Sequence, residues 1–358
     1  MQADDVFRIV EMTLLLAVLL PLSLRWLARH WHAGIHLHGF VFLIYFVEVV
    51  RRHSHPHAWV FNLPVGVFLV ADRVAGVFWR RFSADYTRVT LSPDYLLLLW
   101  RHPRAVDAVG AQVYARLQAS SAAERRHPLI AFENRVGLSS VAGRRGGWTH
   151  GAVVRVYRRR RRPALGARDR ISHTARLADG DDRAPPPLTL WGPFQGSMSE
   201  LALRRMARPG DVALVGGGSA VSFLIDALQF STLPGCECTL SVLFSTRDAA
   251  LLQWAVAVFA EIQGRRGGKR RRSAPQRTKA LVVAALTSTG PMGLHECPAL
   301  LPSAERPGVM AQAGRIRLKL ALPDAGTVFV QGGAAIREAV DLACIVRGCT
   351  LHTNARFD

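Results

Sequence analysis

The sequence predicts a chain in three parts: an α-helical membrane anchor, an antiparallel β-barrel and an α/β domain built on a parallel sheet. Apolar stretches of nearly membrane-spanning length lie before residue 80. Short strands separated by turns follow them, which is typical of a small barrel. After Pro185-Pro186-Pro187, strands alternate with helices, which favours a parallel sheet. The expected domains are residues 1–82, 83–183 and 184–358.

The predicted anchor consists of three apolar stretches, Val10–Leu27, Ile35–Val50 and Ala58–Trp79. A spanning helix needs about 20 apolar residues, so the first and third are near that length and the second is short. A cleaved signal peptide is the alternative for the first stretch, but Asp4 and Asp5 stand where a signal peptide has basic residues. We therefore expect about three transmembrane helices in contact with membrane lipid.

The basic residues near these stretches predict how the anchor is oriented. Arg80 and Arg81 follow the third stretch and lead into a basic domain. Because Lys and Arg favour the cytosolic side of a membrane, the soluble domains are expected to face the cytosol. Arg51 and Arg52, after the second stretch, would then face outward against the same rule. The expectation is an integral membrane protein.

Histidines cluster around the second apolar stretch, at His30, His32, His36, His38, His53, His55 and His57. Ionisable residues in or beside a spanning helix are candidates for function. A haem between helices needs an axial histidine from each of two helices, and no other stretch offers a facing partner. His38 and His53 are the candidate haem-iron ligands, whereas histidines at the membrane interface are the favoured alternative.

Residues 87–157 contain three segments with strand character. Thr87–Trp100 mixes β-branched, aromatic and leucine residues around the turn signal Ser92-Pro93-Asp94. Val109–Leu117 and Gly151–Tyr157 also read as strands. Short strands of this kind, joined by loops, predict the antiparallel barrel.

The last part of the chain alternates strands and helices. Four strands are expected, at Asp211–Leu214, Leu240–Phe244, Leu281–Leu286 and Thr327–Val330. Three helices are expected, at Val221–Phe230, Asp248–Gln263 and Ala334–Arg347. A glycine cluster, Gly216 to Ala220, joins the first strand to the first helix. Glycines here allow the backbone to approach a phosphate at a helix N-terminus, although a plain tight turn explains the same cluster.

The formal net charge of +20 favours anionic partners such as phosphorylated ligands or anionic lipid. Two basic runs, Arg158–Arg162 and Gly264–Lys279, read first as solvated loops. They contain no interleaved aromatic residues, so we expect no nucleic-acid partner. The five cysteines form no Cys-x-x-Cys pair, which argues against a disulfide scaffold or a zinc ribbon.

Several short motifs occur in a fixed order along the chain. They are His127-Pro128-Leu129-Ile130, Gly192-Pro193-Phe194, Gly216 to Ala220, Val328 to Gly333 and the terminal Phe357. In this order the chain resembles the ferric reductase/NADPH oxidase family, within the broader ferredoxin-reductase-like fold. The resemblance implies that residues 83–183 bind FAD and that residues 184–358 bind NADPH or NADH.

The resemblance also implies a set of cofactor-binding residues. The segment at His127, Pro128 and Leu129 would lie against the flavin ring, and Arg155 would clamp a diphosphate with its planar guanidinium. The remaining residues of the set are Ile130 at the end of the flavin segment, Gly192 and Pro193 of the turn, Gly216, Gly217, Gly218 and Ser219 of the nucleotide loop, Gly332, and Phe357.

This chain departs from the family at two positions. Ile130 stands where the family has Thr or Ser, and isoleucine donates no hydrogen bond to a flavin. Gln331 stands where the family has a cysteine close to the nicotinamide. The predicted anchor also holds only about half of the family's six helices.

The expected function is a membrane-bound NAD(P)H-dependent flavoprotein oxidoreductase that passes electrons through FAD to an unknown acceptor such as a ferric chelate or oxygen. A haem-bearing partner subunit would complete a route for electrons across the membrane. The alternative is a degenerate relative that serves as a membrane scaffold or sensor. Arg247 is a candidate contact for the 2′-phosphate of NADPH, and the choice between NADPH and NADH stays open.

Overall fold

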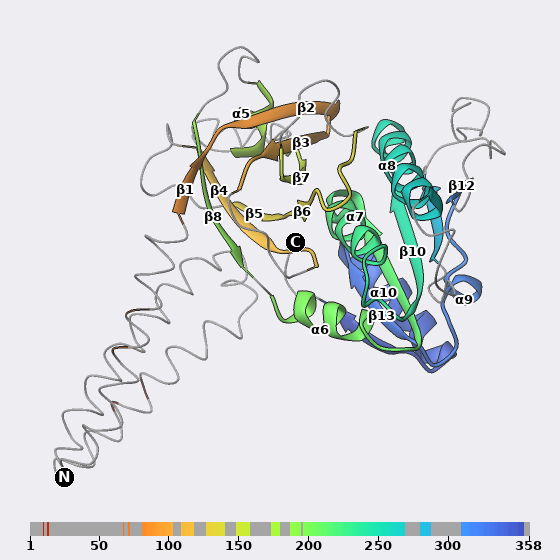
Figure 1. The fold of residues 1–358 in the computed structure, drawn as a ribbon. Coiled ribbons are helices and arrows are strands. Elements are labelled where there is room, and N and C mark those ends of the chain that lie inside the picture. Colours follow the sequence, from red (N-terminus) through yellow and green to blue (C-terminus); the bar gives the residue numbers. More distant parts are fainter. Residues whose placement is uncertain are drawn as a thin grey trace, which may run out of the picture. The chain divides into compact units, whose positions relative to one another are not determined.

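The structure, a computed structural model, describes residues 81–102, 109–117, 127–139, 148–157, 173–179, 187–194, 196–268, 280–287 and 309–353, with residues 10, 13, 67 and 71 as single positions. The chain divides into two compact units, residues 1–80 and 81–358 (Figure 1). The second unit contains an antiparallel lobe followed by a parallel lobe. Most of the predicted anchor, including His38 and His53, lies outside the described residues. Within them, no helix has the length and apolar character that crossing a membrane requires.

The antiparallel lobe consists of two four-stranded sheets. Its elements are β1 (Arg81–Ala84), β2 (Tyr86–Ser92), β3 (Tyr95–Trp100), β4 (Gln112–Leu117), β5 (His127–Ile130), β6 (Phe132–Glu133), β7 (His150–Arg155), helix α5 (His173–Asp179) and β8 (Leu188–Phe194). The strand orders are β1-β8-β4-β5 and β2-β3-β7-β6. Every pairing is antiparallel, as the sequence predicts for this part of the chain.

The antiparallel lobe is longer than the predicted barrel of residues 83–183. Strand β8 lies beyond that range, yet it pairs with both β1 and β4. Strand β1 begins at Arg81, which the sequence assigns to the anchor. The lobe therefore ends at Phe194, because β8 supplies hydrogen bonds to two neighbouring strands.

Strand β3 explains how the two lobes come together. All of its residues from Tyr95 to Trp100 are buried. Successive side chains of a strand point to opposite faces, and those of β3 enter two different cores. Leu96 and Leu98 pack inside the antiparallel lobe. Leu97 and Leu99 pack against a core shared with the helices of the parallel lobe.

The parallel lobe is a six-stranded sheet with helices on both faces. Its elements are α6 (Ser197–Met206), β9 (Asp211–Gly217), the 3₁₀ turn η1 (Gly218–Ala220), α7 (Val221–Phe230), β10 (Thr239–Thr246), α8 (Ala249–Gly268), β11 (Ala280–Leu286), β12 (Val309–Ala313), α9 (Leu318–Ala321), β13 (Thr327–Gln331), α10 (Ala334–Arg347) and β14 (Thr350–Thr353). Each predicted strand and helix of this part is present, and every strand pair is parallel.

The strand order of this sheet is β12-β11-β10-β9-β13-β14. From β9 the chain proceeds outward to β10, β11 and β12 on one side, and then returns to β13 and β14 on the other. The order therefore reverses between β9 and β13. In open parallel sheets, ligands bind outside the carboxyl ends of the strands at such a reversal point.

Helix α7 lies between the lobes and contacts β6 and β7 on one side and β9 and β10 on the other (Figure 1). Nine of its ten residues are buried, which is typical of a helix enclosed by a protein core. Helices α7 and α8 cover one face of the parallel sheet. Helix α10 covers the opposite face, where Val340 and Cys344 pack on strand side chains such as Val330.

Candidate functional site

Two glycine segments meet at the carboxyl edge of the parallel sheet, at the reversal point of the strand order. Gly216 and Gly217 end β9, and Gln331 ends β13 in register with Gly216. A Cβ on Gly332 would lie 3.4 Å from the backbone nitrogen of Gly217. The fold thus brings together the two glycine segments that the sequence singles out.

The space beside the first glycine segment is filled by the protein's own side chains. A Cβ on Gly216 would lie 2.8 Å from Leu224, and one on Gly217 would lie 2.2 Å from Ile336. A side chain at either glycine would therefore displace Leu224 of α7 or Ile336 of α10 from its present position. Ser219 follows in the turn η1 and is half-buried.

The second glycine segment is open at Gly333. No atom lies within 4 Å of the position that a Cβ would occupy on Gly333. This residue is the N-cap of α10, and no side chain caps the helix there. The first turn of α10 holds no acidic residue. Unpaired N–H groups at a helix N-terminus attract anions such as phosphate, so this end of α10 fits a dinucleotide.

The antiparallel lobe presents a cation and an aromatic ring near this edge. Arg155, the last residue of β7, is exposed and pairs in register with Tyr95 of β3. Its guanidinium carbon lies 5.3 Å from the ring centroid of Tyr157. Tyr157 is 53% exposed and was not predicted as a site residue. An exposed cation stacked on an exposed aromatic ring suits a ligand that has both a diphosphate and a flat ring system.

Tyr95 connects this part of the antiparallel lobe to the glycine turn. A Cβ on Gly218 would lie 2.7 Å from the Tyr95 hydroxyl oxygen. Burial raises the pKa of this hydroxyl above its usual value, and the charge of Arg155 acts in the opposite direction. Arg155 and the glycine turn are therefore neighbours through Tyr95, a contact that local sequence patterns do not reveal.

The segment from His127 to Ile130 forms β5 and pairs with β4. Leu129 is only 4% exposed and packs inside the antiparallel lobe, because alternate side chains of β5 point inward. The Leu129 side chain therefore points into the lobe, and the contact of this segment with a flavin stays a prediction. His127, Pro128 and Ile130 are half-buried, and Ile130 packs against the core shared by the lobes.

The predicted turn at Gly192 and Pro193 belongs to the end of β8. A Cβ on Gly192 would lie 2.9 Å from the carbonyl oxygen of Gln112 in β4, so this glycine serves close strand packing. Phe194 then leads towards α6, and its ring stacks edge-on with Tyr114 at 5.8 Å. This segment joins the two lobes.

The end of β10 lies next to the glycine turn. Ser245 pairs in register with Gly217, and the exposed Arg247 follows two residues later. Asp248 begins α8 by accepting the N–H of Leu251 at 2.8 Å. Arg247 therefore lies beside the strand end where a ligand's ribose would be expected.

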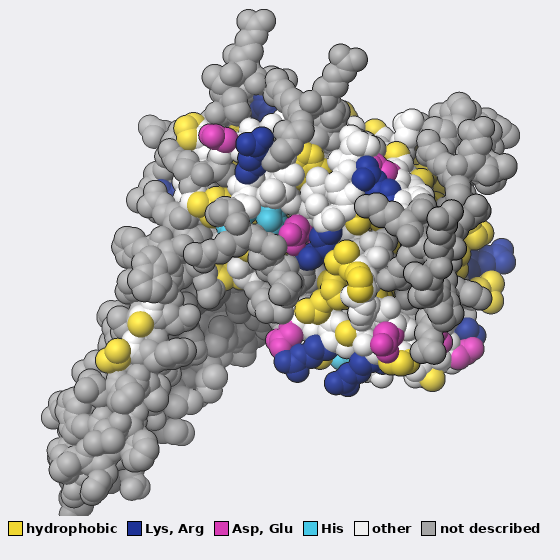
Figure 2. Space-filling view, viewed as in Figure 1, with side chains coloured by type: hydrophobic (Ala, Val, Ile, Leu, Met, Phe, Trp, Pro, Cys, Tyr) yellow, Lys and Arg dark blue, Asp and Glu magenta, His cyan; other side chains and the backbone are white. Residues whose placement is uncertain are grey.

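Phe357 lies outside the described residues. Among the residues that the structure describes, no group of three His, Cys, Asp or Glu side chains could hold a metal ion. The described charged side chains visible in Figure 2 form small groups of both signs. Most of both basic runs also lies outside the described residues.

Comparison with solved structures supports the fold. No protein-family model matches the sequence, and no curated protein matches it. A flavohemoglobin from Malassezia yamatoensis with bound FAD and haem is 11% identical with a TM-score of 0.50, and the match covers 88% of this chain and 73% of that one. At this identity the likeness shows the ferredoxin-reductase-like fold alone.

Two other solved structures are more distant. The CS-b5R domains of human Ncb5or in the NAD⁺ form are 12% identical, with a TM-score of 0.46 and coverage of 76% of this chain and 69% of that one. A ferredoxin NADP⁺ reductase from Neisseria gonorrhoeae with bound FAD and NADP is 8% identical, with a TM-score of 0.45 and coverage of 76% and 98%.

Proposed function

We propose that this chain is an NAD(P)H-dependent flavoprotein oxidoreductase that passes electrons through FAD to an acceptor such as a ferric chelate or oxygen. The observation that supports this most is the reversal of strand order between β9 and β13. The open N-terminus of α10 at Gly333 lies at this reversal point. It and Arg155 of the antiparallel lobe are parts of the same compact unit, residues 81–358. FAD, when bound, accepts a hydride from the nicotinamide and releases electrons singly.

Each side of the site has residues that fit its cofactor. Arg155 would hold the FAD diphosphate through charge-assisted hydrogen bonds, and Tyr157 would offer a flat surface to a ring. On the other side, the backbone N–H groups that follow Gly333 would hold the nucleotide diphosphate. Tyr95 and Gly218 hold the two binding segments next to each other.

The chain is further proposed to be an integral membrane protein of the ferric reductase/NADPH oxidase type, with its soluble part in the cytosol. The apolar stretches before residue 80 support this. Membrane lipid, and a haem-bearing partner subunit, would be its partners. Alkaline carbonate washing tests the anchor: the full chain is expected to stay with the membrane fraction, and release into the supernatant contradicts it.

A degenerate relative that acts as a membrane scaffold or sensor is the second candidate. Ile130 carries no hydroxyl that could donate to a flavin, and Gln331 is a buried amide at 6% exposure. These two residues stand where the resembled family has a hydroxyl and a thiol.

One experiment separates the two candidates. The full chain is extracted in mild detergent, its visible absorption spectrum is recorded, and flavin bleaching by NADPH or NADH is followed by anaerobic stopped flow. An oxidoreductase retains FAD, and its flavin is reduced within seconds. Retained FAD that neither nucleotide reduces favours the degenerate relative. A colourless preparation that takes up no added FAD contradicts the oxidoreductase and likewise favours the degenerate relative.

A further inference from the structure

Helix α7 carries a line of buried polar residues in an otherwise apolar sequence. Ser222, Asp226 and Gln229 are at most 1% exposed. Their spacing of four and three residues places them on one face of the helix. The neighbouring residues Leu224 and Leu228 pack in the shared core. Buried polar groups are nearly always hydrogen-bonded, so each of these three side chains needs a partner on the segment packed against it.

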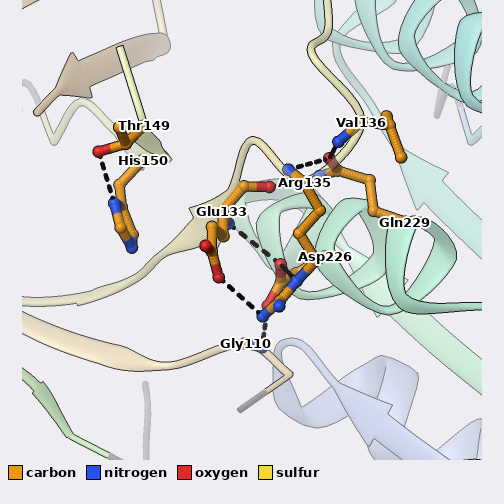
Figure 3. A network of polar contacts seen from close by, with 8 residues as sticks. All are labelled: Gly110, Glu133, Arg135, Val136, Thr149, His150, Asp226 and Gln229. Carbon is orange, nitrogen blue, oxygen red and sulfur yellow. Dashed lines mark hydrogen bonds and ion pairs between the residues drawn. The ribbon is translucent and has the colours of Figure 1, made fainter. Parts of the chain in front are cut away.

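All three polar residues bind the antiparallel lobe. The Ser222 hydroxyl accepts the backbone N–H of Val153 in β7 at 2.8 Å. The Asp226 carboxylate accepts the N–H of Gly110 at 2.7 Å and that of Glu133 at 3.0 Å (Figure 3). These contacts come from separate segments of the lobe, so α7 is held at its beginning and at its middle.

Gln229 completes the line at the end of the helix. Its carbonyl oxygen accepts the N–H groups of Arg135 at 2.9 Å and Val136 at 3.3 Å, and its amide donates to the Glu133 carbonyl at 2.7 Å (Figure 3). The Arg135 guanidinium lies 3.4 Å from Asp226 and 3.1 Å from Glu133. The Arg135 cation thus bridges two carboxylates. One belongs to Asp226 of α7, and the other to Glu133, whose backbone is hydrogen-bonded to Asp226 and Gln229.

The position of α7 gives this network a consequence for the site. The helix follows directly on η1, so it carries the glycine turn at its N-terminus. Val153, the partner of Ser222, lies two residues before Arg155 on β7. Apolar surfaces alone tolerate small shifts, whereas directional hydrogen bonds fix one arrangement. The polar face therefore attaches the helix that follows the glycine turn to the strand that carries Arg155.

We propose that Asp226 and Gln229 are positioning residues for hydride transfer, which hold the nucleotide turn in register with the flavin-binding strand β7. This inference rests on the proposed function. Neither residue would touch a cofactor, because both are buried at the contact between lobes. Their role is to keep the nicotinamide and flavin rings at reacting distance, where a misplacement of about 1 Å costs about 100-fold in rate.

The test uses the full chain with bound FAD and the variants Asp226→Asn and Gln229→Met. Asparagine keeps the shape of the side chain, but its amide N–H groups face a backbone N–H, that of Gly110 or that of Glu133, so one of these two hydrogen bonds is lost. Methionine keeps the volume and removes every hydrogen bond of Gln229. Asp341→Asn, the same change as at Asp226 but on the exposed face of α10, is the matched control. The milder Ser222→Ala replaces any variant that does not fold.

Two readouts are compared for each variant. We expect FAD content and the nucleotide Kd to stay within about threefold of the parent, while single-turnover flavin reduction slows by about 10- to 100-fold. Backbone hydrogen exchange of residues 109–117 and 131–139 is expected to accelerate in the same variants and not in the control. Faster exchange with an unchanged reduction rate would overturn the positioning role and leave a structural one.

The two proposals fail differently. If the parent flavin is reduced by neither nucleotide, the proposed function fails, and the role in hydride transfer fails with it. If the parent is active but exchange in Asp226→Asn and Gln229→Met equals that of the control, the polar face does not hold the lobes together. That result would overturn the inference and leave the proposed function intact.

Discussion

The hydroxyl of Tyr95 occupies the space that any side chain on Gly218 would need. A Cβ on Gly218 would lie 2.7 Å from this oxygen, and the glycine has a φ of +57°, in the left-handed region. Tyr95 belongs to the antiparallel lobe and Gly218 to the parallel lobe. The glycine turn is therefore shaped partly by a residue from the other lobe.

We expect Gly218→Ala to lower the free energy of unfolding by roughly 1–2 kcal/mol from the left-handed backbone, with a further loss from the contact with Tyr95. Tyr95→Phe removes the contacting oxygen, so the double variant should be more stable than the sum of the single changes predicts. Urea denaturation of the four proteins measures this coupling. Strictly additive effects would show that the two residues do not interact.

Arg155→Ala is expected to weaken FAD binding by about 10- to 100-fold, because a charge-assisted hydrogen bond contributes roughly 1.5–3 kcal/mol. The affinity is measured by fluorescence quenching as FAD is added to the stripped protein. Arg208→Ala, at an exposed arginine beyond α6, is the control for lost positive charge. Equal weakening in both variants would point to net charge and away from a specific diphosphate contact.

Arg247→Ala distinguishes the two nucleotides. If the chain uses NADPH, loss of this exposed guanidinium should raise the Kd for NADPH by about tenfold and leave that for NADH unchanged, since only NADPH carries the 2′-phosphate. Isothermal titration with both nucleotides provides the comparison. A parallel change for both, or none for either, removes Arg247 from the recognition of the 2′-phosphate.

The buried carboxyl of Asp226 predicts a dependence of stability on pH. Burial raises its pKa from 3.8 to about 6, and Arg135 and the N–H groups of Gly110 and Glu133 act in the opposite direction. A raised carboxyl pKa contributes stability that is fully present below about pH 4 and is lost as the pH rises through about 6. The parent should therefore lose stability relative to Asp226→Asn across this range.

The size of this effect is on the order of 3 kcal/mol, from about two pKa units at 1.36 kcal/mol each. His150 complicates the parent's own profile, because burial lowers its pKa from 6.5 to about 4, so its contribution is lost as the pH falls. Only the difference between parent and Asp226→Asn isolates Asp226. Denaturation series at pH 4, 5, 6 and 7 measure it, and a constant difference would contradict the raised pKa.

The sequence predicts best the elements whose signals are local. Helices α7 and α10 have the expected bounds, because each begins after a glycine segment and carries a continuous helical pattern. The hairpin of β2 and β3 forms at Ser92-Pro93-Asp94, where the Ser92 hydroxyl accepts the N–H of Asp94 at 3.2 Å. The edge strands β12 and β14 were not predicted, because segments of five and four residues are too short to show a clear strand pattern.

The site was less predictable because its contacts join distant parts of the chain. The sequence identifies the glycine segments and Arg155, but not that Leu224 and Ile336 fill the space beside Gly216 and Gly217. Tyr157 has no local signal apart from its place beside Arg155. The polar face of α7 was detectable, since Ser222, Asp226 and Gln229 interrupt an apolar helix at helical spacing. That pattern indicates a second buried partner surface.

The place of β8 in its sheet has a consequence for how the protein is made. This strand lies between β1 and β4, so the sheet has a gap until residues 188–194 are available. When only the first 187 residues have emerged from the ribosome, β1 and β4 both lack their shared partner β8, and each has an unpaired edge. The antiparallel lobe therefore completes during synthesis only as the parallel lobe begins to emerge, and nascent chains halted before β8 should be prime substrates for chaperones.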